Sequence, residues 1–172
     1  GCPFSCSYCL SSVDKRLRFR SPELVKKELQ FFLDWQVPQV KFVDRTFNCK
    51  KVHALEIWKY LAEHDNGITN FHFEISADLL TDEEIQLMKK MRPGLIQLEI
   101  GVQSVNEDTL KAIGRKMDFS RVKERVRQVK EGGNIHQHLD LIAGLPWEDL
   151  ESFHRPLRKF TPWNRSSFSL DF

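Results

Sequence analysis

Alternation of strand-like and helix-like segments constrains the fold of this chain more than any other feature of its sequence. Strands separated by helices form parallel sheets, because each parallel connection must cross back over the sheet. Two architectures fit this pattern, an open doubly wound sheet and part of a (β/α) barrel. The sequence is therefore expected to be α/β, with strands at residues 40–43, 71–75, 95–100, 138–142 and 167–172.

Helix starts and stops lie between these strands. Ser21 is followed by a proline and an acid, and residues 81–84 form a capping box, so each favours a helix N-terminus. Asn106 is a third capping candidate. The expected helices cover residues 22–35, 51–63, 81 to the stop at Pro93, 106–113, 120–131 and 149–159.

Composition narrows the class of protein. The chain has 172 residues, 41% of them apolar, which suits one domain with a real core. A net charge of +2 gives no general case for nucleic acid or membrane binding. No apolar run is long enough to cross a bilayer and no signal peptide opens the chain, so a cytoplasmic domain is expected. Because a metal-type motif begins at residue 2, we expect an excised segment of a longer protein.

Three of the four cysteines, Cys2, Cys6 and Cys9, lie within eight residues, and Cys49 lies apart. Thiolates suit zinc, copper(I) or iron–sulfur clusters, and a loop this short can curl to bring three sulfurs to one centre. Four cysteines are usual in zinc ribbons and electron-transfer clusters, whereas three leave one iron of a [4Fe–4S] cube open for chemistry. Two alternatives stay open: a packed helical stripe, and zinc with Cys49 as the fourth ligand.

Polar residues stand at or near the carboxyl ends of the expected strands, where both architectures place active sites. These candidates are Asp44, Thr46, Glu74, Gln103 and Asp140.

Residues 1–9 resemble the CX3CX2C loop of the radical S-adenosylmethionine (SAM) superfamily, including the aromatic Tyr8 before the last cysteine. The resemblance continues in the order found in the branch with anaerobic coproporphyrinogen oxidases and methylthiotransferases, at residues 73–75, 99–104, 115 and 140–146. Residues 42–48 resemble cobalamin-binding members such as the anaerobic magnesium-protoporphyrin IX monomethyl ester cyclases. The resemblance covers nearly the whole chain, so one radical SAM core domain is expected over residues 1–172, truncated at both ends.

This resemblance implies a partial (β/α)6 TIM-type barrel whose first strand is missing from the chain. It implies that Cys2, Cys6 and Cys9 hold a [4Fe–4S] cluster, and that SAM chelates the open iron. An electron donor such as a flavodoxin or ferredoxin then drives cleavage of SAM to methionine and a 5′-deoxyadenosyl radical, which attacks a small-molecule substrate. The cobalamin-binding members add an expectation of a tetrapyrrole substrate, and of cobalamin held by a domain outside this chain.

The resemblance also assigns roles to individual side chains. Tyr8 is expected near the adenine and Arg115 at the SAM carboxylate, where a guanidinium fork suits two oxygens. Glu74, Gln103 and Asp140 are expected around the ribose, the methionine moiety or the sulfonium. Each also has an ordinary structural interpretation, as loop packing, a solvated arginine, or a cap or ion-pair partner.

Two positions depart from the family pattern. Gly144 is expected to shape a turn that lets the backbone approach the adenine, but Trp147 stands where the family often has glycine. Arg45 stands where related sequences often carry a second aspartate, which weakens the assignment of Asp44 as a cofactor-binding residue.

Two other functions remain as alternatives: a noncatalytic zinc-binding or scaffold domain, and an RNA-modifying enzyme of the methylthiotransferase type. The basic run at residues 15–20 suits phosphate or carboxylate groups, although such runs are more often solvated surface, so nucleic acid is not expected as a partner. His136 and His138 alternate along a strand and are expected at the surface.

Overall fold

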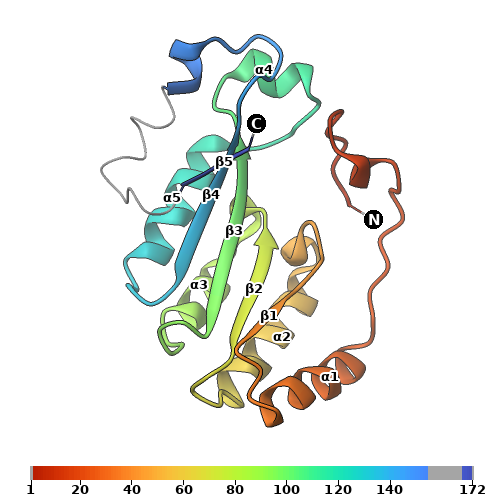
Figure 1. The fold of residues 1–172 in the computed structure, drawn as a ribbon, viewed down its shortest axis with the longest axis vertical. Helices are drawn as coiled ribbons and strands as arrows, with labels where there is room; N and C mark the ends of the chain where they lie inside the picture. Colours follow the sequence, from red (N-terminus) through yellow and green to blue (C-terminus); the bar gives the residue numbers. More distant parts are fainter. Residues whose placement is uncertain (1, 155–167, 172) are drawn as a thin grey trace.

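The computed structural model of this chain describes residues 2–154 and 168–171. Helices and strands alternate within these ranges, as expected (Figure 1). The strands are β1 (Gln39–Lys41), β2 (Asn70–Ile75), β3 (Ile96–Gln103), β4 (His136–Ile142) and β5 (Phe168–Asp171). The helices are α1 (Pro22–Asp34), α2 (Lys51–Glu63), α3 (Asp82–Met88), α4 (Glu107–Ala112) and α5 (Phe119–Lys130), and residues 150–154 begin a further helix.

The described strands form one parallel sheet in the order β1-β2-β3-β4-β5, which is also their order along the chain. A doubly wound sheet reverses its strand order at a switch point, whereas a barrel adds each strand beside the previous one. The observed order is therefore that of a barrel segment, which decides between the two architectures that the sequence allows. The fold is confirmed as α/β of the (β/α) barrel type, and the prediction for residues 155–159, 167 and 172 lies outside the described residues.

The core lies between the sheet and its covering helices. Phe71 and Phe73 of β2 point to this side and are fully buried, and so is Trp58 of α2. The Phe73 ring lies 4.5 Å from both the Phe42 and Phe47 rings, measured between centroids. Burying an aromatic side chain of this kind contributes roughly 1.5–3 kcal/mol, so this cluster fixes the helices against β2.

Local capping explains where the helices begin. The Ser21 hydroxyl accepts a hydrogen bond from the Leu24 amide at α1. Thr81 and Glu84 form the expected capping box of α3, each side chain accepting a bond from the backbone of the other. Asn106 caps α4. Since each cap satisfies otherwise unpaired amides, the predicted starts are confirmed.

Several element ends differ from their predictions. β1 ends at Lys41 and not at residue 43, β4 begins at His136 and not at residue 138, and α3 ends at Met88, before the stop at Pro93. β3 continues to Gln103, beyond the expected end at residue 100, and its pairing with β4 shifts between Gly101 and Gln103. This irregularity is a β-bulge, which keeps the strand paired while it bends.

None of the helices in the described ranges combines the length and hydropathy that crossing a membrane requires.

Candidate functional site

A cavity of about 250 Å³ lies at the carboxyl edge of the sheet, where the N-terminal segment passes the ends of β2, β3 and β4 (Figure 1). It brings together residues that are far apart in the sequence. The lining residues are Cys2, Phe4, Cys6, Tyr8, Cys9, Arg45, Thr46, Glu74, Ile75, Ser76, Glu99, Gly101, Gln103, Arg115, Asp140 and Ile142.

The cysteine loop is attached to the end of α4. The Ser7 amide donates to the Ile113 carbonyl oxygen at 2.8 Å. Gly114 follows with a φ of +65°, and a Cβ at this position would lie 3.0 Å from the Ser5 carbonyl oxygen. Glycine therefore permits both the left-handed turn and the close approach of the loop. The sequence motifs do not single out Gly114, although a glycine just after a helix is a recognisable signal.

The other side of the loop is attached to the segment that follows it. The Cys2 amide donates to the Asp14 carbonyl oxygen at 3.2 Å, and the Lys15 ammonium donates to the Ser5 hydroxyl at 2.5 Å. These bonds fold the chain back on the cysteine loop after the short 3₁₀ turn Leu10–Ser12. The loop is thus held between α4 and residues 14–15.

The three loop thiols all reach the cavity as free cysteines, with Cys2 and Cys6 buried and Cys9 half-buried. The Cys2 sulfur lies 3.8 Å from the Thr46 hydroxyl, and the Cys6 sulfur lies 3.7 Å from Arg115 Nη1. Among residues 2–154 and 168–171, no group of three or more His, Cys, Asp and Glu side chains stands ready to hold a metal ion. The sulfurs therefore share one cavity without converging on a single point.

Arg115 places a guanidinium at the wall of this cavity. Its Nη2 donates to the Gly101 carbonyl oxygen, while its buried Nε has no hydrogen-bond partner among the described residues. A buried donor without a partner is costly, so this guanidinium has capacity to bind an additional acceptor. A carboxylate is the acceptor that best matches its fork.

Gly101 and Gln103 form the bulged end of β3. Gln103 has a φ of +67°, a left-handed conformation that costs a non-glycine residue roughly 1–2 kcal/mol. A Cβ at Gly101 would lie 2.4 Å from Gln103 Nε2 and 3.5 Å from Arg115 Nη2. The missing side chain at Gly101 therefore leaves room for both, and strain of this kind is typical of functional sites.

Carboxylates on the cavity side of the sheet are partly paired with cations. Glu74 lies 3.5 Å from the Lys41 ammonium and 3.4 Å from the Arg45 guanidinium. Glu99 lies 2.8 Å from His72 Nε2 and 3.1 Å from the same lysine. This network holds the two carboxylates in place beside the cavity that Asp140 also lines.

Tyr8 and Cys49 both have thiols as neighbours. Burial raises the pKa of the Tyr8 hydroxyl to about 12, with Arg115 opposing the rise and Cys6 adding to it. The phenol is therefore neutral at physiological pH, with an aromatic face at the cavity.

Burial, together with Asp44 and Cys2, raises the pKa of the Cys49 thiol, which disfavours its metal-binding thiolate form.

Two predicted site residues lie away from this cavity. Asp44 lines a separate hollow of about 400 Å³ beside β1, with Phe42 and His53. Gly144 has a φ of +81° with open space where a side chain would be, so it shapes the turn after β4 without lining the cavity. The other predicted residues, including the three cysteines, all line the cavity.

Asn48 supports the site, although no sequence motif singles it out. Its buried amide donates to the Ser76 carbonyl oxygen at 2.9 Å and accepts from the Ser76 amide at 3.0 Å. It therefore ties the loop after β1 to the loop after β2. An asparagine shortly after a strand was the available signal, but its partner is 28 residues away.

The turn after β4 is tied to the loop after β3. The Ser104 hydroxyl donates to Glu148 Oε1 at 2.5 Å, and the Asn106 amide donates to the Trp147 carbonyl oxygen at 2.9 Å. Trp147 has a φ of +62°, so the turn keeps a left-handed residue although it lacks the family's glycine there. Burial raises the pKa of Glu148, against the opposing bond from Ser104.

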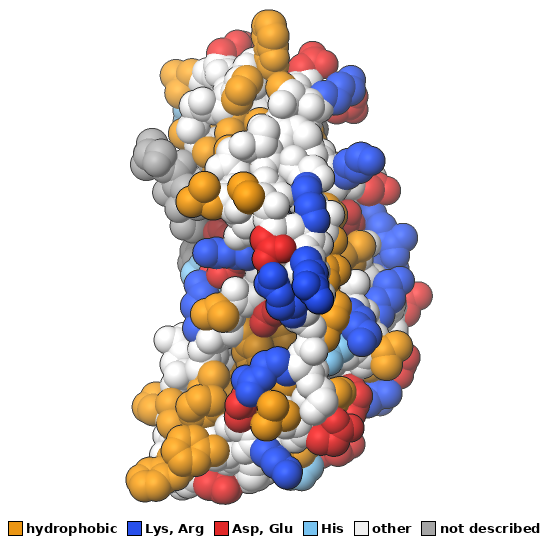
Figure 2. Space-filling view, turned by 90° about the vertical axis from the view of Figure 1, so that its right-hand side faces the viewer, with side chains coloured by type: hydrophobic (Ala, Val, Ile, Leu, Met, Phe, Trp, Pro, Cys, Tyr) orange, Lys and Arg blue, Asp and Glu red, His pale blue; other side chains and the backbone are white. Residues whose placement is uncertain are grey.

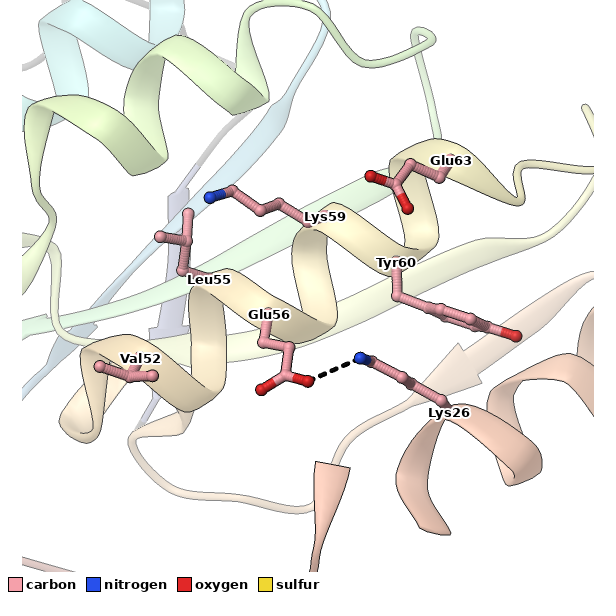
Figure 3. A pocket seen from close by; sticks show the side chains of 7 residues that line it. All are labelled: Lys26, Val52, Leu55, Glu56, Lys59, Tyr60 and Glu63. Carbon is pink, nitrogen blue, oxygen red and sulfur yellow. Dashed lines mark hydrogen bonds and ion pairs between the residues drawn. The ribbon is translucent and has the colours of Figure 1, made fainter. Parts of the chain in front are cut away.

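A further hollow lies between α1 and α2, and fewer reactive side chains converge on it than on the cysteine cavity (Figure 3). Lys26 and Glu56 reach toward each other across it, with 2.6 Å between Nζ and Oε1, and Tyr60 lies beside them. The Lys26 and Glu56 charges thus neutralise each other, and the hollow lies outside the cysteine cavity.

His136 and His138 lie on the same side of β4, with 2.9 Å between their Nε2 atoms.

Comparisons with known proteins identify the family of this chain. The radical SAM superfamily model matches residues 1–158. The cobalamin-dependent radical SAM methyltransferase TokK of Streptomyces tokunonensis is 29% identical over 164 residues, covering 89% of this chain and 23% of that protein. The anaerobic magnesium-protoporphyrin IX monomethyl ester cyclase of Rubrivivax gelatinosus is 22% identical over 166 residues, covering 95% and 30%.

A relative that acts on RNA and a solved structure extend the comparison. The tRNA-2-methylthio-N(6)-dimethylallyladenosine synthase of Clostridium botulinum is 26% identical over 165 residues, covering 91% of this chain and 37% of that protein. The radical SAM methyltransferase TsrM from Kitasatospora setae, solved with cobalamin and a [4Fe–4S] cluster, superposes with a TM-score of 0.81 at 18% identity, covering 99% and 35%. The chain thus spans between 23% and 37% of the length of these relatives. On the strength of the family match, this chain belongs to the radical SAM superfamily.

Proposed function

We propose that this chain is the catalytic core of a radical SAM enzyme. It would bind a [4Fe–4S] cluster through Cys2, Cys6 and Cys9, and SAM through the ends of the strands. The observation that carries the proposal is that the three loop thiols and Arg115 open onto one cavity at the carboxyl edge of the sheet.

The donor set fits a cluster with one open iron. Three thiols supply three ligands, and Cys49 is not among the residues that line the cavity. The cluster and SAM, once bound, supply the chemistry of the superfamily, in which one electron cleaves SAM to methionine and a 5′-deoxyadenosyl radical. The protein's part is to bind, orient and exclude water.

Arg115 would bind the SAM carboxylate, because its unpartnered Nε and its fork suit two oxygens. Gly101 and the strained Gln103 set the position of that guanidinium from beside it. Asp140 and Glu74 would bind the ribose or the methionine moiety from the ends of their strands. A neutral Tyr8 ring supplies area for the adenine.

The cobalamin-dependent and tetrapyrrole-related members are the favoured subgroup. Residues 42–48 resemble these members, and TokK and the cyclase are relatives. The substrate is then a small molecule such as a tetrapyrrole, with cobalamin supplied by a domain outside this chain. Asp44 belongs to this proposal and not to SAM binding, because it lies in the separate hollow beside β1.

An RNA-modifying enzyme is a second candidate function. The methylthiotransferase-type relative from Clostridium botulinum favours it, together with the basic residues 15–20. Binding of transfer RNA to the full chain at physiological salt would support this candidate.

Anaerobic reconstitution with iron and sulfide tests the proposal. The protein is expected to hold about four irons and, after reduction with dithionite, to form 5′-deoxyadenosine from SAM. Serine at Cys2, Cys6 or Cys9 is expected to remove both properties, whereas Cys49→Ser is the matched control that keeps them. Stoichiometric zinc with no SAM cleavage would instead establish the zinc-binding alternative. Circular dichroism of each variant checks that a lost cluster is not the result of unfolding.

A further inference from the structure

Apolar side chains are exposed beside the cysteine loop. Cys9 is the N-cap of the 3₁₀ turn Leu10–Ser12, and two side chains on or next to this turn face solvent. Leu10 is 89% exposed and Val13 is 80% exposed. The Val13 amide donates to the Leu10 carbonyl oxygen at 3.1 Å, so one turn presents both aliphatic side chains to solvent.

Basic residues follow these two side chains along the chain. Residues 10–20, which we call the basic strip, contain four Lys or Arg and one Asp, a net charge of +3. The whole chain has a net charge of +2, so the remainder is slightly negative at −1. Figure 2 shows Lys and Arg side chains gathered across the middle of the face along which the N-terminal segment runs.

Most of the basic strip is open to solvent. Residues 13–20 are all exposed. Arg18 pairs with Asp14 at 2.8 Å and Arg20 with Glu28, but both are surface pairs of small energetic value. The guanidinium of Arg16 has no hydrogen-bond or ion-pair partner within residues 2–154 and 168–171.

We propose that the basic strip is the docking surface for an acidic one-electron carrier protein of the flavodoxin or ferredoxin class. This inference rests on the proposed function, because it places the entry of the electron at the loop that would hold the cluster. The reduced carrier gives up one electron and is thereby oxidised. Each electron that reaches the cluster cleaves one SAM. A small apolar centre with a charged rim fits the weak, transient interfaces of redox partners.

The observations favour a protein partner over RNA. Leu10 and Val13 present aliphatic surface, which neither stacks on bases nor pairs with phosphates. RNA binding is therefore an outcome that the test must be able to detect.

The test compares two double variants of the full reconstituted chain. Arg16→Glu/Arg18→Glu reverses two exposed charges of the basic strip, while Lys90→Glu/Lys130→Glu reverses two exposed charges near α3 and α5 and is the matched control. Lys15 is left unchanged because it anchors the cysteine loop. Formation of 5′-deoxyadenosine is measured with reduced flavodoxin and, separately, with dithionite, which needs no docking surface.

We expect the flavodoxin-driven rate to fall about tenfold or more at low salt in Arg16→Glu/Arg18→Glu, with the dithionite-driven rate unchanged. The control variant should match the wild type with both reductants. Leu10→Ser/Val13→Ser should give a smaller loss that persists at high salt, because it removes apolar contact. Equal flavodoxin-driven rates in Arg16→Glu/Arg18→Glu and the control would overturn the proposal.

Binding of oxidised flavodoxin to the immobilised chain gives a second readout that does not depend on activity. Loss of binding in Arg16→Glu/Arg18→Glu alone supports the docking surface, and unchanged binding overturns it. Loss of transfer RNA binding with flavodoxin binding intact also overturns it. Failure of dithionite to drive SAM cleavage in the wild type would contradict the proposed function, and flavodoxin binding would then decide the docking proposal by itself.

Discussion

One face of the sheet packs apolar side chains under the helices, whereas the other face carries polar and charged side chains toward the cavity. In β2, Phe71 and Phe73 are fully buried on the helix side, while His72 and Glu74, which alternate with them, face the other way. The same alternation runs through β3, where Leu98 is buried and Glu99 lines the cavity. Of two successive residues in these strands, one therefore contributes to the stability of the core and the next to the chemistry of the cavity.

This division arises because successive side chains of a strand point to opposite faces. The helix-covered face determines whether the sheet forms, and the polar face determines what the sheet can bind. Substitutions on the two faces should consequently affect different measurements. The following predictions test that separation.

The largest effect is expected from Phe73→Ala on the helix-covered face. Its ring packs against Phe42, Phe47 and Trp58, so truncation leaves a cavity in the core. We expect the free energy of unfolding to fall by about 3–5 kcal/mol, measured by urea denaturation. The adjacent Glu74→Gln should change it by less than about 1 kcal/mol while lowering SAM cleavage. Similar destabilisation by both would contradict the separation of the two faces.

Arg115→Lys should affect chemistry far more than stability. A lysine keeps the charge but loses the fork that bonds the Gly101 carbonyl and would bind a carboxylate. We expect the rate of 5′-deoxyadenosine formation with dithionite at subsaturating SAM to fall roughly 100-fold, about 2.7 kcal/mol. An unchanged dependence of the rate on SAM concentration would show that Arg115 does not contact SAM.

Gly114→Ala and Gly133→Ala form a matched pair that separates loop position from backbone strain. Both glycines have positive φ, so alanine at either should cost about 1 kcal/mol of stability, measured by denaturation. Only at Gly114 would the new Cβ press on the Ser5 carbonyl of the cysteine loop, since Gly133 faces open space. We therefore expect only Gly114→Ala to lower the iron content after reconstitution. Equal iron contents would mean that the loop position is not set by α4.

The smallest effect is expected from Glu148→Gln. Burial raises the pKa of Glu148 above the ordinary value of 4.5, so ionisation of this carboxyl disfavours the folded state. The wild type should lose stability relative to E148Q as pH rises above about 4.5, and the difference should vanish at lower pH, where the carboxyl is neutral. Thermal melting from pH 4 to 8 measures this trend, and a trend of opposite sign would contradict it.

Local rules made much of this molecule predictable from its sequence. Ser21, Thr81 and Asn106 cap their helices through bonds to residues two or three positions away, so their signals lie within one turn. The three cysteines and Arg115 were identified by motif, and the structure places them around one cavity. Short-range patterns suffice where the partners are close in sequence.

Long-range contacts account for what the sequence did not show. The partner of Asn48 is Ser76, and Gly114 matters because the cysteine loop, more than 100 residues earlier, packs on it. The bulge that extends β3 depends on pairing with β4. Asp44 lies in a different hollow, although Arg45 and Thr46, the next residues of the same loop, line the cavity. No local pattern encodes these distances.

Electron paramagnetic resonance of the reduced, reconstituted chain tests the central assignment most directly. If three cysteines leave one iron open, adding SAM should change the g-values of the cluster signal, and Cys49→Ser should behave like the wild type. A signal that SAM leaves unchanged, or a cluster that survives in Cys6→Ser, would contradict an open-iron site at this loop.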